Sequence, residues 1–256
     1  MSWSETAALE PLRGVGGFFA MALDTLVAIF RRPFAWREFL EQSWFVARVC
    51  LLPAVVLGIP FTVLSVFFFN TLLVEFGAAD LSGTGASLTA VNQIGPFTTV
   101  LVVAGSGASA MCADLGARTI REELDAMRVM GIDPIQALVV PRMLAATVVA
   151  LLLSSLVTIT GLFGGFMFAV FLQHVTPGAF VGGMTLITHL GDVLVSMVKA
   201  TLFGLTAGLV ACHRGITVSG GPAGVGNAVN ETVVYSFLLL FVINLVLTAV
   251  GYEVVK

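Results

Sequence analysis

Five long apolar stretches restrict the possible folds of this chain more than any other feature. They cover residues 48–75, 90–113, 134–172, 186–212 and 229–252. A helix needs about 20 residues to cross the hydrocarbon core of a bilayer, and lipid offers no hydrogen-bond partner to an exposed backbone group. Each stretch is therefore predicted to be a membrane-spanning helix. The stretches are too long and too uniformly apolar for β-barrel strands, so the sequence predicts an all-α polytopic membrane protein.

The composition excludes several other classes of protein. Of the 256 residues, 58% are hydrophobic and only 11% are charged, whereas a soluble domain usually has about 25% charged residues. Too few charges remain for a soluble globular domain, a disordered chain or a nucleic-acid binder. Five spans with short links use most of the length, so we expect a single domain over residues 1–256.

A shorter apolar run precedes the first predicted span. It covers residues 14–32, is interrupted by Asp24, and ends in Arg31 and Arg32, where a secretory signal would have small residues and a cleavage site. Because the run is short for a complete span, we predict a helix that lies in the membrane interface with its Phe and Leu side chains in the acyl boundary. A short, broken span is the alternative.

The positive charges lie in alternate links. The two links at about 76–89 and 173–185 contain no Lys or Arg. By the positive-inside rule, the arginine-rich side faces the cytoplasm. We therefore expect a multi-pass protein of the plasma (inner) membrane, with its N-terminus in the cytoplasm and its C-terminus outside. Ten of the twelve cations lie on the predicted inner side: Arg13, Arg31, Arg32, Arg37, Arg48, Arg118, Arg121, Arg128, Arg142 and Arg214.

The most highly charged segment, residues 114–133, separates the second and third spans. In it, Thr119 and Glu122 form a capping-box pattern, which predicts that a helix starts near Ile120. We therefore predict a short cytoplasmic helix over residues 119–131. Its alternative interpretation is a solvated loop helix, which is the usual fate of a run of charges.

Signals at the end of this helix predict a tight connection to the third span. Gly131 suits the C-terminal end of a helix, and Asp133 followed by Pro134 favours the start of the next one. The helix would then be tied to a span at each end. A connection without slack transmits movement, which a flexible loop would not.

Three motifs along the chain carry a likeness to a known family. They are FRRPF at Phe30–Phe34, the stretch Gly95–Arg142 with RTIREELDAMRVMGIDP inside it, and GGPAGVGNAVNETVV at Gly220–Val234. Together they resemble the MlaE/YrbE family of permeases, and most of all the A-type YrbE permeases of actinobacterial Mce lipid-transport systems. The likeness covers nearly the whole chain. It implies a fold of one interfacial helix and five spans.

The resemblance also implies a function and partners. It implies the permease subunit of an ABC-type lipid transporter, which would import lipids or other hydrophobic molecules across the cell envelope. ATP and Mg would be bound by a separate cytoplasmic ABC ATPase dimer, while this chain would bind no cofactor and would not be an enzyme. Further expected partners are a second YrbE-type permease, as a paralogue, and Mce-domain proteins on the outer side. No nucleic acid is expected.

Residues 119–131 resemble the coupling segment of ABC permeases, a short helix that docks into the ATPase subunit. We expect three carboxylates to make polar contacts with the ATPase and three apolar side chains to seat the helix. The predicted coupling residues, including the glycine that ends the helix, are Glu122, Glu123, Leu124, Asp125, Met127, Met130 and Gly131.

Ionisable residues within the last two spans form a second candidate group. Lys199 lies inside the fourth span, Asp192 lies two turns away on about the same face, and Glu231 begins the fifth span. A charge at the centre of a span is costly, so it should have a partner or face water. This group either lines the lipid path or a subunit contact, or it is a buried ion pair that sets helix register.

Glycines predict close helix packing and a turn. Gly161–Gly165 and Gly204–Gly208 both fit the G-x-x-x-G pattern, which lets helix backbones approach in lipid; a flexible gate is the alternative. Gly220–Gly226 lacks the Lys-Ser/Thr ending of a phosphate-binding loop, so we expect a tight turn there, capped by Asn227, and no ATP site. The sequence shows neither a metal site nor a catalytic set, and it does not identify the residues that contact the lipid.

Two other functions remain open at this point. An ion-driven secondary transporter would need ion-coordinating groups in broken helices, usually within internal repeats, and the sequence shows no repeat. A membrane scaffold subunit would keep its partners but have no transport path.

Overall fold

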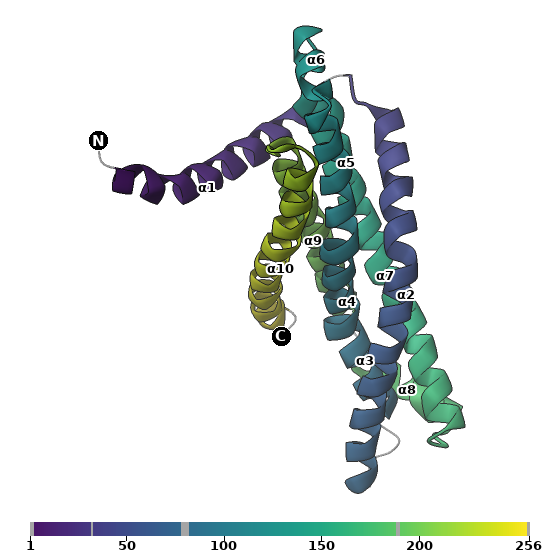
Figure 1. The fold of residues 1–256 in the computed structure, drawn as a ribbon. Coiled ribbons are helices and arrows are strands. Elements are labelled where there is room, and N and C mark those ends of the chain that lie inside the picture. Colours follow the sequence, from purple (N-terminus) through teal and green to yellow (C-terminus); the bar gives the residue numbers. More distant parts are fainter. Residues whose placement is uncertain (1–2, 32, 78–81, 188–189, 255–256) are drawn as a thin grey trace.

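The computed structural model describes residues 3–31, 33–77, 82–187 and 190–254, and these ranges form helices with no strand (Figure 1). Three segments in the second and third spans are π-helical and are labelled η. In chain order the elements are α1 Trp3–Ala28, α2 Trp36–Glu75, α3 Ser82–Thr89, η2 Ala90–Ile94, α4 Gly95–Val102, η3 Val103–Ala108, α5 Ser109–Ile120, α6 Glu123–Val129, η4 Ile135–Val139, α7 Val140–Phe171, α8 Pro177–Ile187, α9 Leu190–Ile216 and α10 Gly221–Val254.

Five helical stretches within the described residues are long and apolar enough to cross a membrane. Each corresponds to one of the predicted spans, so the predicted fold class, an all-α polytopic membrane protein, is confirmed. The stretches are Trp36–Leu73, Gly83–Ile120, Ile135–Phe171, Gly191–Ile216 and Gly221–Gly251.

The first and last of these helices begin earlier than the apolar composition predicts. α2 starts at Trp36 instead of near residue 48, and its added turns are amphipathic. α10 starts at Gly221 instead of near residue 229. Within the predicted turn Gly220–Gly226, only Gly220 and Gly221 have a positive φ, so the turn before α10 is shorter than predicted. Asn227 lies inside the helix and does not cap it.

Close approach of helix backbones holds the centre of the bundle together. A side chain at Gly161 or Gly165 would collide with Thr62 or Val66 of α2, and one at Gly204 would collide with the backbone of α7. Both predicted G-x-x-x-G faces are therefore helix contacts: the first joins α7 to α2 and the second joins α9 to α7. Because α7 takes part in both, it is the central helix of the bundle.

The links at the far end of the bundle contain helices that the sequence analysis did not predict. α3 extends the second span at its N-terminal end, and α8 lies beside it (Figure 1). Gly83 of α3 faces the main chain of Phe180 at a distance that leaves no room for a side chain. The Thr84 hydroxyl also donates a hydrogen bond to the Gly183 carbonyl at 2.8 Å. The two short helices therefore close this end together.

Helix α1 runs crosswise to the bundle at the opposite end (Figure 1). Met21 and Phe18 face α7 and α9, and the Phe18 ring lies edge-on to His213 at 5.6 Å between centroids. Phe19, Leu23 and neighbouring apolar side chains are exposed. Within α1, the apolar part is the segment Gly16–Ala28. This crosswise, one-sided arrangement is what a helix in the membrane interface requires, although the helix is longer at its N-terminus than the predicted 14–32 and ends at Ala28.

Candidate coupling site

Helix α6 is the short charged helix predicted between the second and third spans, but it begins later than predicted. α5 continues through Ile120, and α6 starts at Glu123. The Thr119 hydroxyl donates to the carbonyls of Leu115 and Gly215, each at 2.9 Å, so it does not cap α6. The capping-box prediction is therefore wrong: a contact with α9 holds Thr119 inside the preceding helix.

Glu122 forms the joint between α5 and α6. Its backbone has φ +60°, in the left-handed region that non-glycine residues seldom occupy. Its side chain makes no capping hydrogen bond to α6, and the residue is exposed. Strained conformations of this kind cost about 1–3 kcal/mol and persist only where surrounding structure imposes them. The contacts of α5 and α6 with the bundle impose this one.

The end of α6 follows the prediction closely. Gly131 has φ +76°, its N–H donates to the Arg128 carbonyl at 3.0 Å, and the Ile132 N–H donates to the Met127 carbonyl at 2.9 Å. This pair of bonds is a Schellman motif. The Asp133 carboxylate then accepts a hydrogen bond from the Ile135 N–H at 3.0 Å, as an N-cap does. Little slack therefore separates α6 from the third span.

The apolar side chains of α6 divide between the protein interior and its surface. Leu124 is only 3% exposed and packs against Leu115 and Leu138 of its own chain, so it cannot seat α6 in a partner as predicted. Met127 is partly buried in the same cluster. Met130 is 67% exposed, and Val129, which the sequence analysis did not select, is 89% exposed. Leu124 thus anchors α6 to the bundle, and the end of the helix carries its free apolar surface.

Two of the three predicted acidic contacts have cationic neighbours within the segment. Glu123 pairs with Arg121 at 2.8 Å, and Asp125 pairs with Arg128 at 2.7 Å. All four side chains are well exposed, so these ion pairs are weak and open to exchange with a partner. The exposed Glu122 adds a third carboxylate at the joint. The free surface of α6 therefore combines charged groups with the methionine and valine at its end.

A charge cluster centred on a buried arginine lies where α2, α5 and α7 meet, and sequence analysis missed it. Arg142 of α7 is fully buried, and its guanidinium donates to Asp114 of α5 at 2.7 Å and forms an ion pair with Glu38 of α2 at 3.0 Å. Arg118 adds a pair with Asp114 at 3.5 Å. The available signal was an arginine eight residues inside a stretch that is otherwise apolar.

Two contacts tie the segment behind α6 to the link between α1 and α2. Arg31 pairs with Asp133 at 3.8 Å, and the Gln136 side-chain amide donates to the Pro33 carbonyl at 3.1 Å. The link between α1 and α2 is therefore attached to the start of the third span, directly behind α6.

The structure does not bring the predicted intramembrane polar group together. Lys199 is 3% exposed and donates to the Thr248 hydroxyl of α10 at 2.9 Å. Asp192 accepts a hydrogen bond from the Asn92 side chain at 3.5 Å. Glu231 pairs with Arg214 at 2.8 Å, near the turn between α9 and α10. Lys199 thus contacts α10, Asp192 contacts η2, and Glu231 contacts the end of α9.

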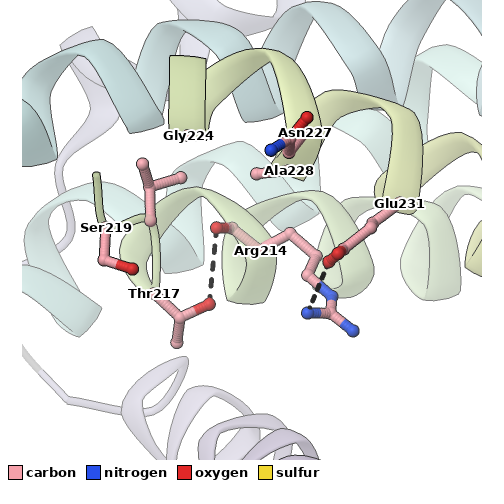
Figure 2. A pocket seen from close by; sticks show the side chains of 8 residues that line it. Arg214, Thr217, Ser219, Gly224, Asn227, Ala228 and Glu231 are labelled. Atoms are coloured by element: carbon pink, nitrogen blue, oxygen red, sulfur yellow. Dashed lines mark hydrogen bonds and ion pairs between the residues drawn. The ribbon is translucent and has the colours of Figure 1, made fainter. Parts of the chain in front are cut away.

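Figure 2 shows a small polar pocket of about 270 Å³ at the turn between α9 and α10. Arg214 lies along it with its guanidinium paired to Glu231 and placed over the ring of Tyr235, 4.5 Å from the centroid. The Thr217 hydroxyl donates to the Arg214 carbonyl at 3.4 Å. The charge of the Arg214 guanidinium is therefore largely satisfied by Glu231 and Tyr235 of the same chain.

The fold and this site define a class of protein: a helical integral membrane protein with a short charged helix held between two of its spans. Comparison with known proteins identifies the family. The sequence profile described as Permease MlaE matches residues 39–250, and the chain belongs to the MlaE permease family.

Individual relatives agree with this assignment. A probable ABC transporter permease of Synechocystis sp. is 32% identical over 85% of this chain and 82% of its own length. The MlaE permease of an intermembrane phospholipid transport system in Haemophilus influenzae is 28% identical over 70% of this chain and 69% of its own length. The chloroplast protein TRIGALACTOSYLDIACYLGLYCEROL 1 of Arabidopsis thaliana is 27% identical over 91% of this chain and 67% of its own length. The chain is therefore an ABC transporter permease of the MlaE type.

Proposed function

We propose that this chain is the permease subunit of an Mce-type lipid transporter, in which a separate ABC ATPase dimer binds ATP and Mg and moves α6. The Haemophilus relative is named for intermembrane phospholipid transport, which supports a phospholipid or a similar amphiphile as cargo. We further propose that the cargo is imported, that a paralogous permease completes the membrane unit, and that Mce-domain proteins bind on the outer side.

The observation that carries the proposal is the way α6 is held. Leu124 anchors α6 on its buried face, and the Schellman motif at Gly131 and the N-cap at Asp133 join the helix to the third span. The outer surface of α6 is left free. A force on that surface would act on the ends of α5 and α7 directly. This is what coupling between an ATPase and a membrane path requires.

The distribution of charge supports an orientation with α6 in the cytoplasm. The described arginines that flank α6, the start of α2 and the turn after α9 lie at one end of the bundle (Figure 1). The links at α3 and α8 carry no Lys or Arg. By the positive-inside rule, this distribution supports an N-terminus inside and a C-terminus outside the plasma membrane.

Docking is tested by reversing charge on α6. The double variant Glu122→Lys with Glu123→Lys should lose most of the ATPase that co-purifies with the membrane complex, because Glu122 is exposed and Glu123 partly exposed at the start of α6. Glu41→Lys is the matched control, since Glu41 is an exposed, arginine-paired glutamate near the same end of α2. A folded double variant that retains ATPase in the wild-type ratio contradicts the assignment of α6.

Cargo and direction are tested in proteoliposomes. The purified complex is reconstituted with a fluorescent phospholipid, and its movement is followed with ATP and with a non-hydrolysable analogue. ATP-dependent movement of lipid toward the ATPase side is expected. Movement that follows an ion gradient in the absence of ATP would instead indicate a secondary transporter.

A further inference from the structure

The guanidinium of Arg142 joins three helices at a single point. Its two terminal nitrogens contact Asp114 of α5 at 2.7 Å and Glu38 of α2 at 3.0 Å, and one also donates to the Leu138 carbonyl at 3.2 Å. Arg142 itself belongs to the first turn of α7. The residue therefore links the starts of α2 and α7 to the end of α5.

This point lies directly behind the helix that is proposed to bind the ATPase. Asp114 is less than three turns from the joint at Glu122, and Leu138 packs in the same cluster as Leu124 of α6. A displacement of α6 reaches α5 through that joint and α7 through Gly131. It has no direct link along the chain to α2, which packs along α7 through the Gly161–Gly165 face. Arg142 is a direct polar connection between α2 and both of these helices.

Stability alone is a poor reason for such a cluster. Replacing a buried ion pair with apolar side chains of similar volume is often neutral or stabilising, because the charges must be desolvated. A guanidinium, however, has a rigid planar fork that engages two carboxylates at fixed angles, which a lysine ammonium does not reproduce. The cluster therefore supplies geometric definition between helices that apolar packing would leave free to slide.

We propose that Arg142 is a positioning residue that makes the adjoining ends of α2, α5 and α7 move as one body when α6 is displaced. The inference rests on the proposed function, and it adds the route by which movement reaches α2. The contacts of Asp133 with Arg31 and of Gln136 with Pro33 continue the same connection to the link before α2.

The experiment compares three variants in the complete complex with its ATPase. Arg142→Met removes the charge at similar length, Arg142→Lys keeps the charge without the fork, and Arg37→Gln is the control. Arg37 is also an arginine paired with a glutamate at this end of the bundle, but its side chain is 94% exposed. Co-purified ATPase, ATP hydrolysis and phospholipid moved per ATP hydrolysed are measured for each.

The expected result is loss of coupling with assembly retained. Arg142→Met should keep its ATPase and hydrolyse ATP, while lipid moved per ATP falls about tenfold or more, a change typical of coupling energies. Arg142→Lys should recover part of the ratio, and Arg37→Gln should match the unsubstituted complex. A wild-type ratio in Arg142→Met overturns the inference. So does loss of the ATPase from both Arg142 variants, because the residue would then support docking.

A distance measurement separates positioning from simple structural support. Spin labels at Leu40 of α2 and Ile132 behind α6, both exposed, should keep their separation when the complex is trapped with an ATP analogue. In Arg142→Met the separation should change between the two states. An unchanged separation in the variant contradicts the proposal.

Additional variants and the unsubstituted complex cover the cases in which Arg142→Met does not fold or the proposed function fails. If Arg142→Met does not yield a folded complex, Glu38→Gln and Asp114→Asn each leave one ion pair, and each should lower the transport ratio; wild-type ratios in both contradict the proposal. Failure of the proposed function would look different, because the unsubstituted complex would then move no lipid with ATP.

Discussion

A single methyl group added at Gly204 should part the two central helices. Gly204 of α9 faces α7, and a Cβ there would lie 2.5 Å from the Ala146 carbonyl oxygen, 2.6 Å from the Thr147 Cα and 2.7 Å from the Ala150 Cβ. Two of these atoms belong to the main chain and cannot rotate away. Ordinary contact begins near 3.4 Å, so Gly204→Ala requires α9 to withdraw from α7 by close to 0.9 Å.

The magnitude follows from three opposing effects. Replacing glycine by alanine inside a helix gains up to about 1 kcal/mol, whereas overpacking costs about 1–3 kcal/mol. A gap of about 0.5–1 Å also removes a quarter to a half of each dispersion contact along the interface, and such contacts are a main source of helix association in lipid. Because the lost dispersion contacts offset the gain in helix propensity, we expect Gly204→Ala to lower the free energy of unfolding by about 1–3 kcal/mol in total.

Gly226→Ala is the matched control. Gly226 lies inside α10, and no heavy atom lies within 4 Å of a Cβ built there, so this variant gains helix propensity without a collision. The assay is unfolding of the purified chain by increasing mole fraction of SDS, followed by circular dichroism. If Gly204→Ala unfolds at the same or a higher SDS fraction than Gly226→Ala, the argument from close packing is refuted.

Three further outcomes are expected. Lys199→Met should raise the free energy of unfolding by about 2 kcal/mol on insertion scales, because the partner of the ammonium is a hydroxyl and carries no opposite charge. A fall in SDS resistance would contradict this. Loss of lipid transport in the stabilised protein would place Lys199 on the transport path. Gly131→Ala strains a residue at φ +76° by about 1 kcal/mol and should lower ATP-driven transport, with unchanged transport as the contrary result. Finally, Cys50, Cys112 and Cys212 are free and buried, so maleimide should label them only after unfolding, and rapid labelling of the folded chain would show that these helix contacts are open.

The number and position of the spans could be predicted because lipid imposes the same requirement on every segment: apolar side chains outside and backbone hydrogen bonds inside. Links obey no such rule. α3 and α8 have 8 and 11 residues and little helical signal of their own, and they are held by contacts between each other, such as Gly83 against Phe180. A contact between segments about 100 residues apart leaves no local trace in the sequence.

The same distinction divides the candidate site. Gly131 and Asp133 could be predicted because their roles depend on the neighbouring backbone alone. The role of Thr119 could not be predicted, since its hydroxyl donates a hydrogen bond to the Gly215 carbonyl of α9. The orientation of Leu124 depends on which face of α6 the bundle covers. The partners of Arg142 come from two other helices, so its burial among apolar residues was a signal of a partner but not of its identity.

The two residues in the left-handed conformation that flank α6 fix the number of residues that the helix can contain. The joints at Glu122 and Gly131 each interrupt the helical path at one position, and each neighbouring span is packed in place. A residue inserted between them would turn everything after it by about 100° around the helix axis. Either Leu124 would leave its cluster or Met130 would leave the free surface. The fold should therefore tolerate substitutions on the exposed face of α6 far better than any change in its length, even where such substitutions weaken the proposed contact with the ATPase.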